Sequence, residues 1–150
     1  MIKLICVGSI KENELTSLIN EYLKRISKYT KIEIIEVPDY DYDIKETLKK
    51  EGEQILKNVS PKDFVVTMEI EGKELTSIEL SEKIRTTLIT NSNIDFVIGG
   101  SYGLDESVKA RSNYKLSFSK LTFPHQLFRL ILLEQIYRSF KIINNETYHK

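Results

Sequence analysis

The sequence predicts an α/β fold in which a mainly parallel sheet is flanked by helices. Short apolar runs rich in β-branched residues alternate with longer stretches in which apolar residues recur every three or four positions. This alternation favours strand–helix–strand units, whose strands lie parallel. With 150 residues, 41% of them hydrophobic and 29% charged, the chain has the size and composition of one ordinary globular domain. We therefore expect a single domain over residues 1–150.

Five apolar runs predict the strands of this sheet. They cover Lys3–Val7, Lys31–Val37, Phe64–Ile70, Ile94–Ile98 and Lys115–Ser119. Directly after the third run, Glu71-Gly72-Lys73 predicts a turn that leads the chain away from the sheet.

Helical spacing predicts five helices. They cover about Glu12–Tyr29, Ile44–Asn58, Thr76–Ile89, Leu104–Arg111 and His125–Ile143. Thr76, with Glu79 three residues later, has the pattern of a capping box at the start of the third helix. The first two turns of the last helix are apolar nearly all round, so we expect cover on two sides, with a second subunit as one of the covers.

Several classes of protein are disfavoured by the sequence. The apolar run in Met1–Gly8 is too short for a secretion signal, which predicts a cytoplasmic protein. Arg129, Glu134 and Arg138 argue against a membrane span in the last helix. Cys6 is the single cysteine and lies in an apolar run, so we expect it to be buried and free. No Cys/His cluster has the spacing of a metal site, and we expect no metal.

Charge is distributed unevenly although the net charge is zero. Residues 1–108 hold 14 Lys/Arg and 20 Asp/Glu, whereas residues 109–150 hold 8 Lys/Arg and 2 Asp/Glu. A basic C-terminal segment on an acidic body is expected where that segment faces phosphates. Positive residues near the end of a C-terminal helix are also common partners of the helix dipole, so nucleic acid is one of two interpretations.

Gly99-Gly100, directly after the fourth strand, is the first candidate for a ligand site. Ligands of open parallel sheets bind beyond the carboxyl ends of the strands, and glycines allow a close approach of backbone to ligand. A tight turn would explain the same two glycines. Neither GxGxxG after the first strand nor GxxxxGK[ST] is present. A nucleotide-type cofactor would then be held by backbone groups in apolar loops, which suits S-adenosylmethionine with its positive sulfonium.

Three further positions carry polar chemistry near the C-terminus. His125, after Pro124 at the start of the last helix, can reach a cofactor or a backbone carbonyl. Thr122 can bind a ligand or cap that helix. Tyr148-His149-Lys150 combines an aromatic ring, an imidazole and a cation, which could stack on a base, move a proton and hold a phosphate. A disordered terminus is the alternative for this tail.

Four stretches carry a resemblance to a known family. They are Phe96–Leu104, Leu121–Leu127 together with Arg129, Glu134–Arg138, and Tyr148–Lys150. In this order, and along essentially its whole length, the sequence resembles the large-subunit rRNA pseudouridine N3-methyltransferases of the SPOUT superfamily, the α/β-knot enzymes.

The resemblance implies a C-terminal trefoil knot, a topology that general folding rules disfavour. It also implies that the knot binds S-adenosylmethionine and that two subunits pack their knots together into a homodimer, with the tail of one closing the site of the other. By motif position, the implied cofactor-binding residues are Met68, Gly100, Lys120, Leu121, Thr122, Phe123, Pro124 and His125.

The implied reaction is methyl transfer to N3 of a pseudouridine in 23S rRNA, within the large subunit or the assembled ribosome. The nitrogen bears a proton, so a base must accept it, and we assign that role to His149. Tyr148 would position the flipped base, and Arg138 or Lys150 would hold a phosphate.

Three alternatives remain at this point. A knotted methyltransferase could act on tRNA or on another rRNA nucleotide, although the Tyr-His-Lys tail favours the rRNA family. A noncatalytic RNA-binding module could serve ribosome assembly. A flavodoxin-like binding domain fits the first four strands but leaves residues 115–150 without an explanation.

Overall fold

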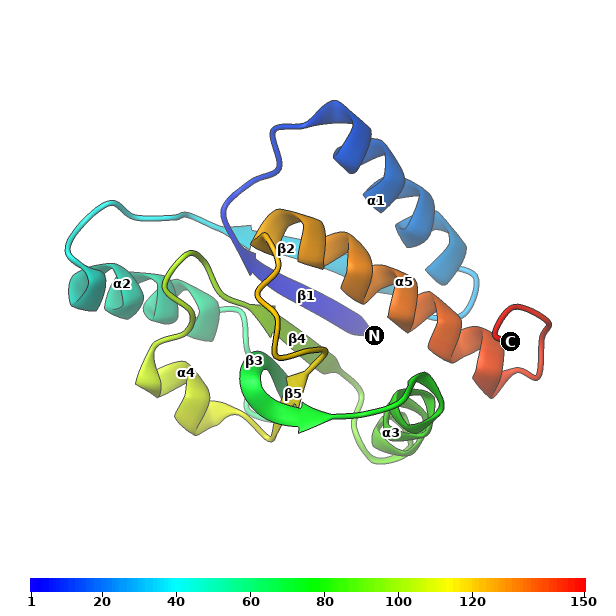
Figure 1. Cartoon of the computed structure of the whole chain (residues 1–150). Helices are drawn as coiled ribbons and strands as arrows, with labels where there is room; N and C mark the ends of the chain where they lie inside the picture. The colour runs from blue at the N-terminus through cyan, green and yellow to red at the C-terminus, as the bar shows by residue number, and fades with distance from the viewer.

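The computed structural model describes residues 1–150 and contains one five-stranded sheet in the order β2-β1-β4-β3-β5 (Figure 1). The strands are β1 (Ile2–Val7), β2 (Ile32–Val37), β3 (Phe64–Glu74), β4 (Ile94–Ile98) and β5 (Tyr114–Ser117). All four neighbouring pairs are parallel, which confirms the predicted sheet. The carboxyl ends of the strands therefore meet at one edge.

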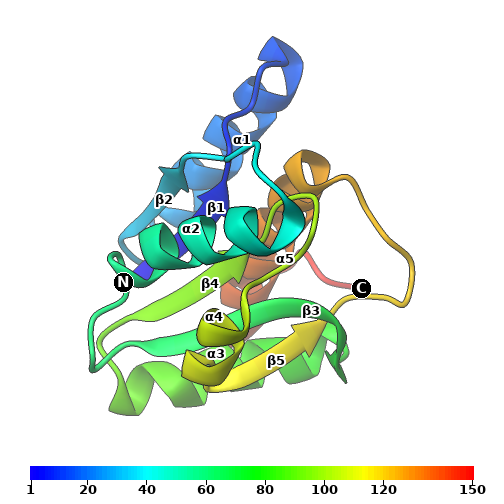
Figure 2. The same cartoon turned by 90° about the vertical axis from the view of Figure 1, so that its left-hand side faces the viewer.

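Five helices cover the sheet on both faces (Figures 1 and 2). They are α1 (Asn13–Ile26), α2 (Ile44–Leu56), α3 (Ser77–Thr90), α4 (Glu106–Arg111) and α5 (His125–Ile143). The predicted capping box is present, since Thr76 and Glu79 each accept a hydrogen bond from the other's backbone N–H. The bounds of α5 are those that the sequence predicts. None of the helices is long and apolar enough to cross a membrane.

The core is divided by the sheet into two clusters of buried side chains. The larger one lies where α1, α3 and α5 pack on the sheet, and the smaller one includes residues of α2 and α4. Every residue of β1 and β4 is buried, as the near-continuous apolar runs of central parallel strands require. Cys6, as predicted, is buried and free, and burial raises its pKa to about 12, so the thiol stays protonated.

The end of β3 differs from the prediction. Glu71-Gly72-Lys73 does not turn away, because β3 continues to Glu74 and pairs again with β5 after an irregularity between Met68 and Lys73. Gly72 makes this possible: a Cβ at this position would stand 2.7 Å from the carbonyl oxygen of Lys115. The missing side chain lets the bent strand approach the β5 backbone closely.

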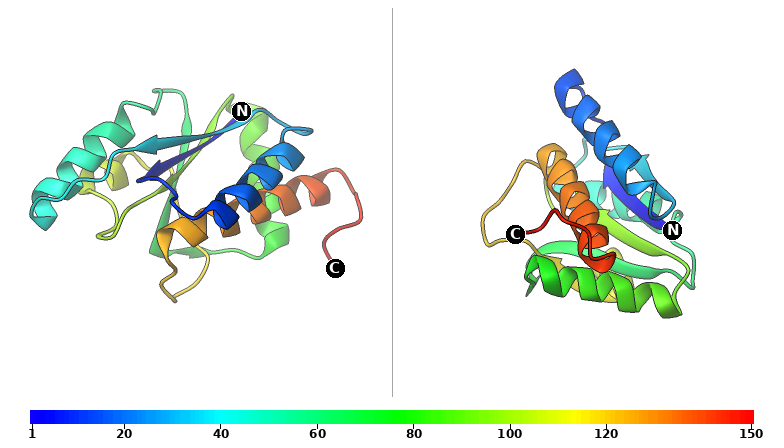
Figure 3. Two further views of the ribbon diagram at one scale, coloured as in Figure 1. Left: turned by 90° about the horizontal axis from the view of Figure 1, so that it is seen from above. Right: turned by 90° about the vertical axis from the view of Figure 1, so that its right-hand side faces the viewer.

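Helix α5 lies between α1 and α3 over the sheet (Figure 3). Leu133 and Ile136 are completely buried there. The chain itself thus covers the middle of α5. In the first two turns, where the sequence led us to expect a second subunit, no apolar side chain is buried and Leu127 is 42% exposed, so the partner there stays a prediction.

A buried ionic cluster lies at the opposite edge of the sheet, where the strands begin. Lys3 Nζ lies 2.9 Å from a carboxylate oxygen of Asp63 and 3.6 Å from one of Asp95. Both carboxylate oxygens of Asp95 are buried without a hydrogen bond. Burial, followed by the influence of Asp63, raises the pKa of Asp95 to about 7.

This cluster predicts a pH dependence of stability. Between the unfolded pKa of an aspartate, about 3.9, and about 7, the folded protein holds a proton on Asp95 that the unfolded chain releases. Stability therefore falls progressively as the pH rises from about 4 to about 7, where Asp95 loses its proton in the folded protein. Asp95→Asn should remove this loss, so its free energy of unfolding should gain about 3 kcal/mol relative to wild type between pH 5 and 8. Urea unfolding of both proteins at pH 5 and pH 8 measures this gain. If the difference in free energy of unfolding between the two proteins is the same at both pH values, the prediction is wrong.

Candidate functional site

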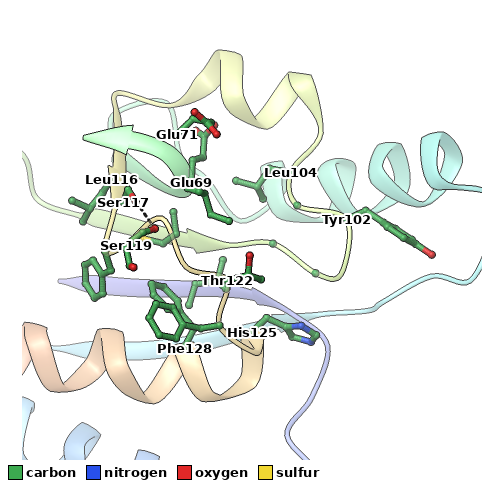
Figure 4. Close-up of a pocket in the computed structure, with 18 of the residues that line it drawn as sticks. Glu69, Glu71, Tyr102, Leu104, Leu116, Ser117, Ser119, Thr122, His125 and Phe128 are labelled. Atoms are coloured by element: carbon green, nitrogen blue, oxygen red, sulfur yellow. Dashed lines mark hydrogen bonds between the residues drawn. The ribbon is translucent and has the colours of Figure 1, made fainter. Parts of the chain in front are cut away.

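A cavity of about 330 Å³ opens at the carboxyl ends of β3, β4 and β5 (Figure 4). Its walls come from residues 68–71 of β3, the turn at residues 98–104, the loop at residues 116–123 and the first turn of α5. This is the edge where an open parallel sheet is expected to bind a ligand, and the volume lies in the range of small-molecule sites, about 300–1,000 Å³.

The glycines after β4 form a tight turn that is also a wall of the cavity. The N–H of Gly103 donates to the carbonyl of Gly100 at 3.2 Å, and Gly103 has a φ of +83°. A Cβ on Gly99 would overlap the carbonyl group of Gly103. The two interpretations of Gly99-Gly100, a turn and a close approach to a ligand, are therefore compatible.

The loop between β5 and α5 is ordered by its own serines and aromatic rings. Ser117 Oγ donates to the carbonyl of Ser119, and Ser119 Oγ accepts from the N–H of Leu121, both at 3.0 Å. The ring of Phe128 lies against Phe118 and Phe123, with centroid separations of 5.2 and 6.0 Å. These three rings form an aromatic wall on the α5 side.

Six of the eight residues proposed to bind the cofactor line this cavity. They are Met68, Gly100, Leu121, Thr122, Phe123 and His125. Lys120 and Pro124 belong to the same loop but do not line it. Thr122 does not cap α5, because Pro124 occupies the N-cap position and no side chain bonds to the first amides of the helix. The first N–H groups of α5, which begins beside the cavity, thus have no side-chain partner.

Two carboxylates of the cavity wall escaped the sequence analysis. Glu69 and Glu71 lie at the β3 side, across from His125 and Phe128 (Figure 4). The expected turn at residues 71–73 placed Glu71 outside the sheet, so nothing pointed to an acidic wall. An acidic residue directly after Met68 at a strand end was the available signal.

Arg129, part of the motif after Pro124, is a structural residue. It is 2% exposed, and its guanidinium pairs with Glu36 Oε2 at 2.6 Å and donates to the carbonyl of Gly8 at 3.2 Å. These bonds tie the start of α5 to the ends of β1 and β2. The α5 wall of the cavity is fixed by them.

The three proposed catalytic residues meet at the other end of α5. Arg138 Nη1 lies 3.1 Å from His149 Nδ1, and its guanidinium carbon lies 4.8 Å from the ring centroid of Tyr148. The tail folds back through Glu146, which accepts from Lys141 Nζ at 3.0 Å and from the Tyr29 hydroxyl at 2.9 Å. Helix α5 has 19 residues and spans about 28 Å, so within one chain this cluster and the cavity are far apart (Figure 1).

Electrostatics limits what the tail can do in this arrangement. A guanidinium has only donors, so Nδ1 of His149 accepts from Arg138 and the proton of the neutral imidazole lies on Nε2. Burial and the neighbouring Tyr22 raise the pKa of Tyr148 to about 12, which keeps its hydroxyl protonated at neutral pH. Arg138 is also paired with Glu134 at 2.9 Å.

Much of the positive charge of residues 109–150 is engaged inside the chain. Arg129, Arg138 and Lys141 form ion pairs with glutamates. Arg111 donates to three backbone carbonyls between residues 60 and 63. The uneven charge of the sequence therefore supports a nucleic-acid surface less strongly in the folded protein. No group of three or more His, Cys, Asp or Glu residues is placed to hold a metal ion.

Comparisons with known proteins agree with this geometry. Residues 1–149 match the family model described as "Predicted SPOUT methyltransferase". Two Clostridium botulinum proteins, from strains Kyoto and Hall, are each 52% identical over 157 aligned positions that cover 99% of both chains, and both are named "Ribosomal RNA large subunit methyltransferase H".

Similarity extends to a solved structure. A Haemophilus influenzae Rd KW20 protein, described as "a probable methylase family protein", superposes with a TM-score of 0.58 at 15% identity and covers 99% of this chain and 70% of its own. At that identity the likeness concerns the fold alone. The family match over nearly the whole chain and the relatives above 50% identity are decisive: the chain belongs to the SPOUT methyltransferase family.

Proposed function

We propose that this protein transfers a methyl group from S-adenosylmethionine to N3 of a pseudouridine in 23S rRNA, on the large subunit or the assembled ribosome, in the cytoplasm. The observation that carries the proposal is the cavity at the strand ends, built from the motif segments of a SPOUT family member. The names of its relatives support large-subunit rRNA as the substrate.

The residues of the cavity fit this cofactor. The aromatic wall suits an adenine ring, and the 98–104 turn lines the same cavity, where its backbone groups could pair with the polar edge of that ring. The free N–H groups at the start of α5 favour the carboxylate of the methionine moiety. When bound, S-adenosylmethionine supplies a methyl group already activated by its sulfonium. We also propose that the chain forms a trefoil knot, in which the turn at residues 98–104 and the loop at residues 116–123 enclose the cofactor.

In the proposed reaction, His149 accepts the N3 proton of the target base. The imidazole must first leave Arg138, because Nδ1 already accepts from that guanidinium and Nε2 carries the proton. An rRNA phosphate is a stronger partner for a guanidinium than a neutral imidazole, so substrate binding can release His149. Tyr148, neutral at the working pH, stacks against the flipped base, and Lys150, for which the structure shows no ion pair, holds a phosphate.

A homodimer would bring the two halves of this site together. The tail of one chain lies a helix length from its own cavity, and a two-fold partner could place its tail there instead. Leu121 and Leu127, 70% and 42% exposed beside the cavity, offer apolar surface for such a contact.

The substrate is tested by labelled methyl transfer from S-adenosylmethionine to matched ribosomes that carry either uridine or pseudouridine at the target. We expect incorporation into 23S rRNA with pseudouridine and little with uridine. Labelling of tRNA in place of ribosomes would reject the substrate assignment.

The role of His149 is tested by His149→Ala under single-turnover conditions with saturating RNA. Loss of a general base should lower the rate by roughly 100-fold or more, while cofactor binding stays unchanged. Lys150→Ala is the matched control, since it should weaken RNA binding and flatten its salt dependence without changing the rate at saturation. An unchanged rate for His149→Ala removes the base from the mechanism.

The exchange of tails is tested by mixing two inactive variants. Thr122→Arg places a long cation in the cavity, and His149→Ala disables the tail. If tails act on the partner's cavity, each heterodimer contains one intact site, and a random mixture should recover about a quarter of wild-type activity. If each tail serves its own chain, the co-expressed mixture stays inactive.

A further inference from the structure

We propose that Glu69 recognises the positive charge of the methyl donor and makes the cavity prefer S-adenosylmethionine over the demethylated product, S-adenosylhomocysteine. The inference rests on the proposed function and names a specificity residue within the same site.

The carboxylate of Glu69 is held in a defined position within β3, directly after Met68, where the pairing with β5 becomes irregular. Its Oε2 accepts a hydrogen bond of 2.6 Å from the hydroxyl of Thr67, a residue with no exposed surface. The Ser112 hydroxyl lies 2.7 Å from Thr67 Oγ1 and 3.0 Å from the carbonyl oxygen of Tyr114. With the Thr67 proton on Glu69, Ser112 has one proton to share between Thr67 Oγ1 and that carbonyl. Glu69 is thus anchored from the protein interior.

Other charges around the cavity leave it with a negative wall. Glu71 lies two residues further along β3 and is exposed. Lys109, the one lysine of the lining, lies 3.8 Å from Glu106 and so has an acidic neighbour of its own. The facing wall consists of His125 and the aromatic rings (Figure 4). A cavity of this polarity suits a cation and disfavours phosphate-bearing nucleotides.

Charge is the main chemical difference between donor and product. The donor carries a sulfonium, and transfer of its methyl group leaves a neutral thioether; the adenosine, ammonium and carboxylate groups stay the same. A carboxylate beside that sulfur, next to apolar walls where electrostatic interactions are strengthened, stabilises the donor and not the product. Glu69 fits this role better than Glu71, because it is half-buried and anchored, whereas solvent screens an exposed carboxylate.

Calorimetric titration of Glu69→Gln with each ligand tests the proposal. The amide oxygen of glutamine can still accept the Thr67 hydrogen bond, so the fold and the anchor are preserved. Donor affinity should fall roughly fivefold, as expected for one partly exposed charge interaction, and product affinity should change less than twofold. Glu74→Gln is the control, with the same charge change on the same strand outside the cavity, and should alter neither affinity.

Two further measurements sharpen the test. Glu69→Asp retains the charge and should recover part of the preference for the donor. Added salt should lower the ratio of donor affinity to product affinity in the wild-type protein but not in Glu69→Gln. The inference is overturned if Glu69→Gln leaves the ratio of the two affinities unchanged, whether both fall or neither does. If the wild-type protein binds neither ligand, the proposed function itself fails. If it binds both and only the effect of Glu69→Gln is missing, the role of Glu69 fails and the proposed function stands.

Discussion

The buried guanidinium of Arg129 fixes the relation between the last helix and the sheet. It joins the second turn of α5 to Glu36 at the end of β2 and to the carbonyl of Gly8 just after β1. A buried charge that loses its partners costs several kcal/mol, so α5 cannot slide along the sheet without a large penalty. Phe128, next to Arg129, and His125, one turn earlier, are thereby held over the strand ends, and the cavity acquires a rigid wall.

The parallel sheet also determines where α5 ends. Helix α5 begins at the edge that holds the carboxyl ends of the strands and runs back across the sheet toward their amino ends (Figure 1). The chain therefore places the loops of the cavity at one edge and its C-terminal tail near the other. The cluster of Arg138, Tyr148 and His149 is well packed there, with Tyr148 edge-on to Tyr137 at 4.9 Å. In the proposed mechanism, a second chain would bring such a tail to the cavity.

Sequence reasoning recovered the elements whose patterns are local. The apolar periods predict all ten elements, and the bounds of β4 and α5 agree with the structure. The prediction for the end of β3 was wrong because a glycine at position 72 is typical of a turn. In the structure Gly72 allows a close approach to the Lys115 backbone, which the local sequence pattern does not show. Of the eight cofactor-binding residues proposed from motif position, six line one cavity. Motif position missed Glu69, whose significance depends on the fully buried Thr67 hydroxyl that holds it.

The charge of a sequence segment does not predict the charge of the site that its loops help to form. The basic C-terminal segment suggests a surface for phosphates, yet Arg129 and Lys141 are paired within the chain and contribute to packing. The cavity takes only Lys109 from that segment as a charged lining residue, whereas β3, outside the segment, supplies the carboxylates of Glu69 and Glu71. Because the site is assembled from four separated stretches, its polarity is set by which side chains the sheet edge brings together. An acidic pocket can therefore lie among the loops of the most basic part of the chain.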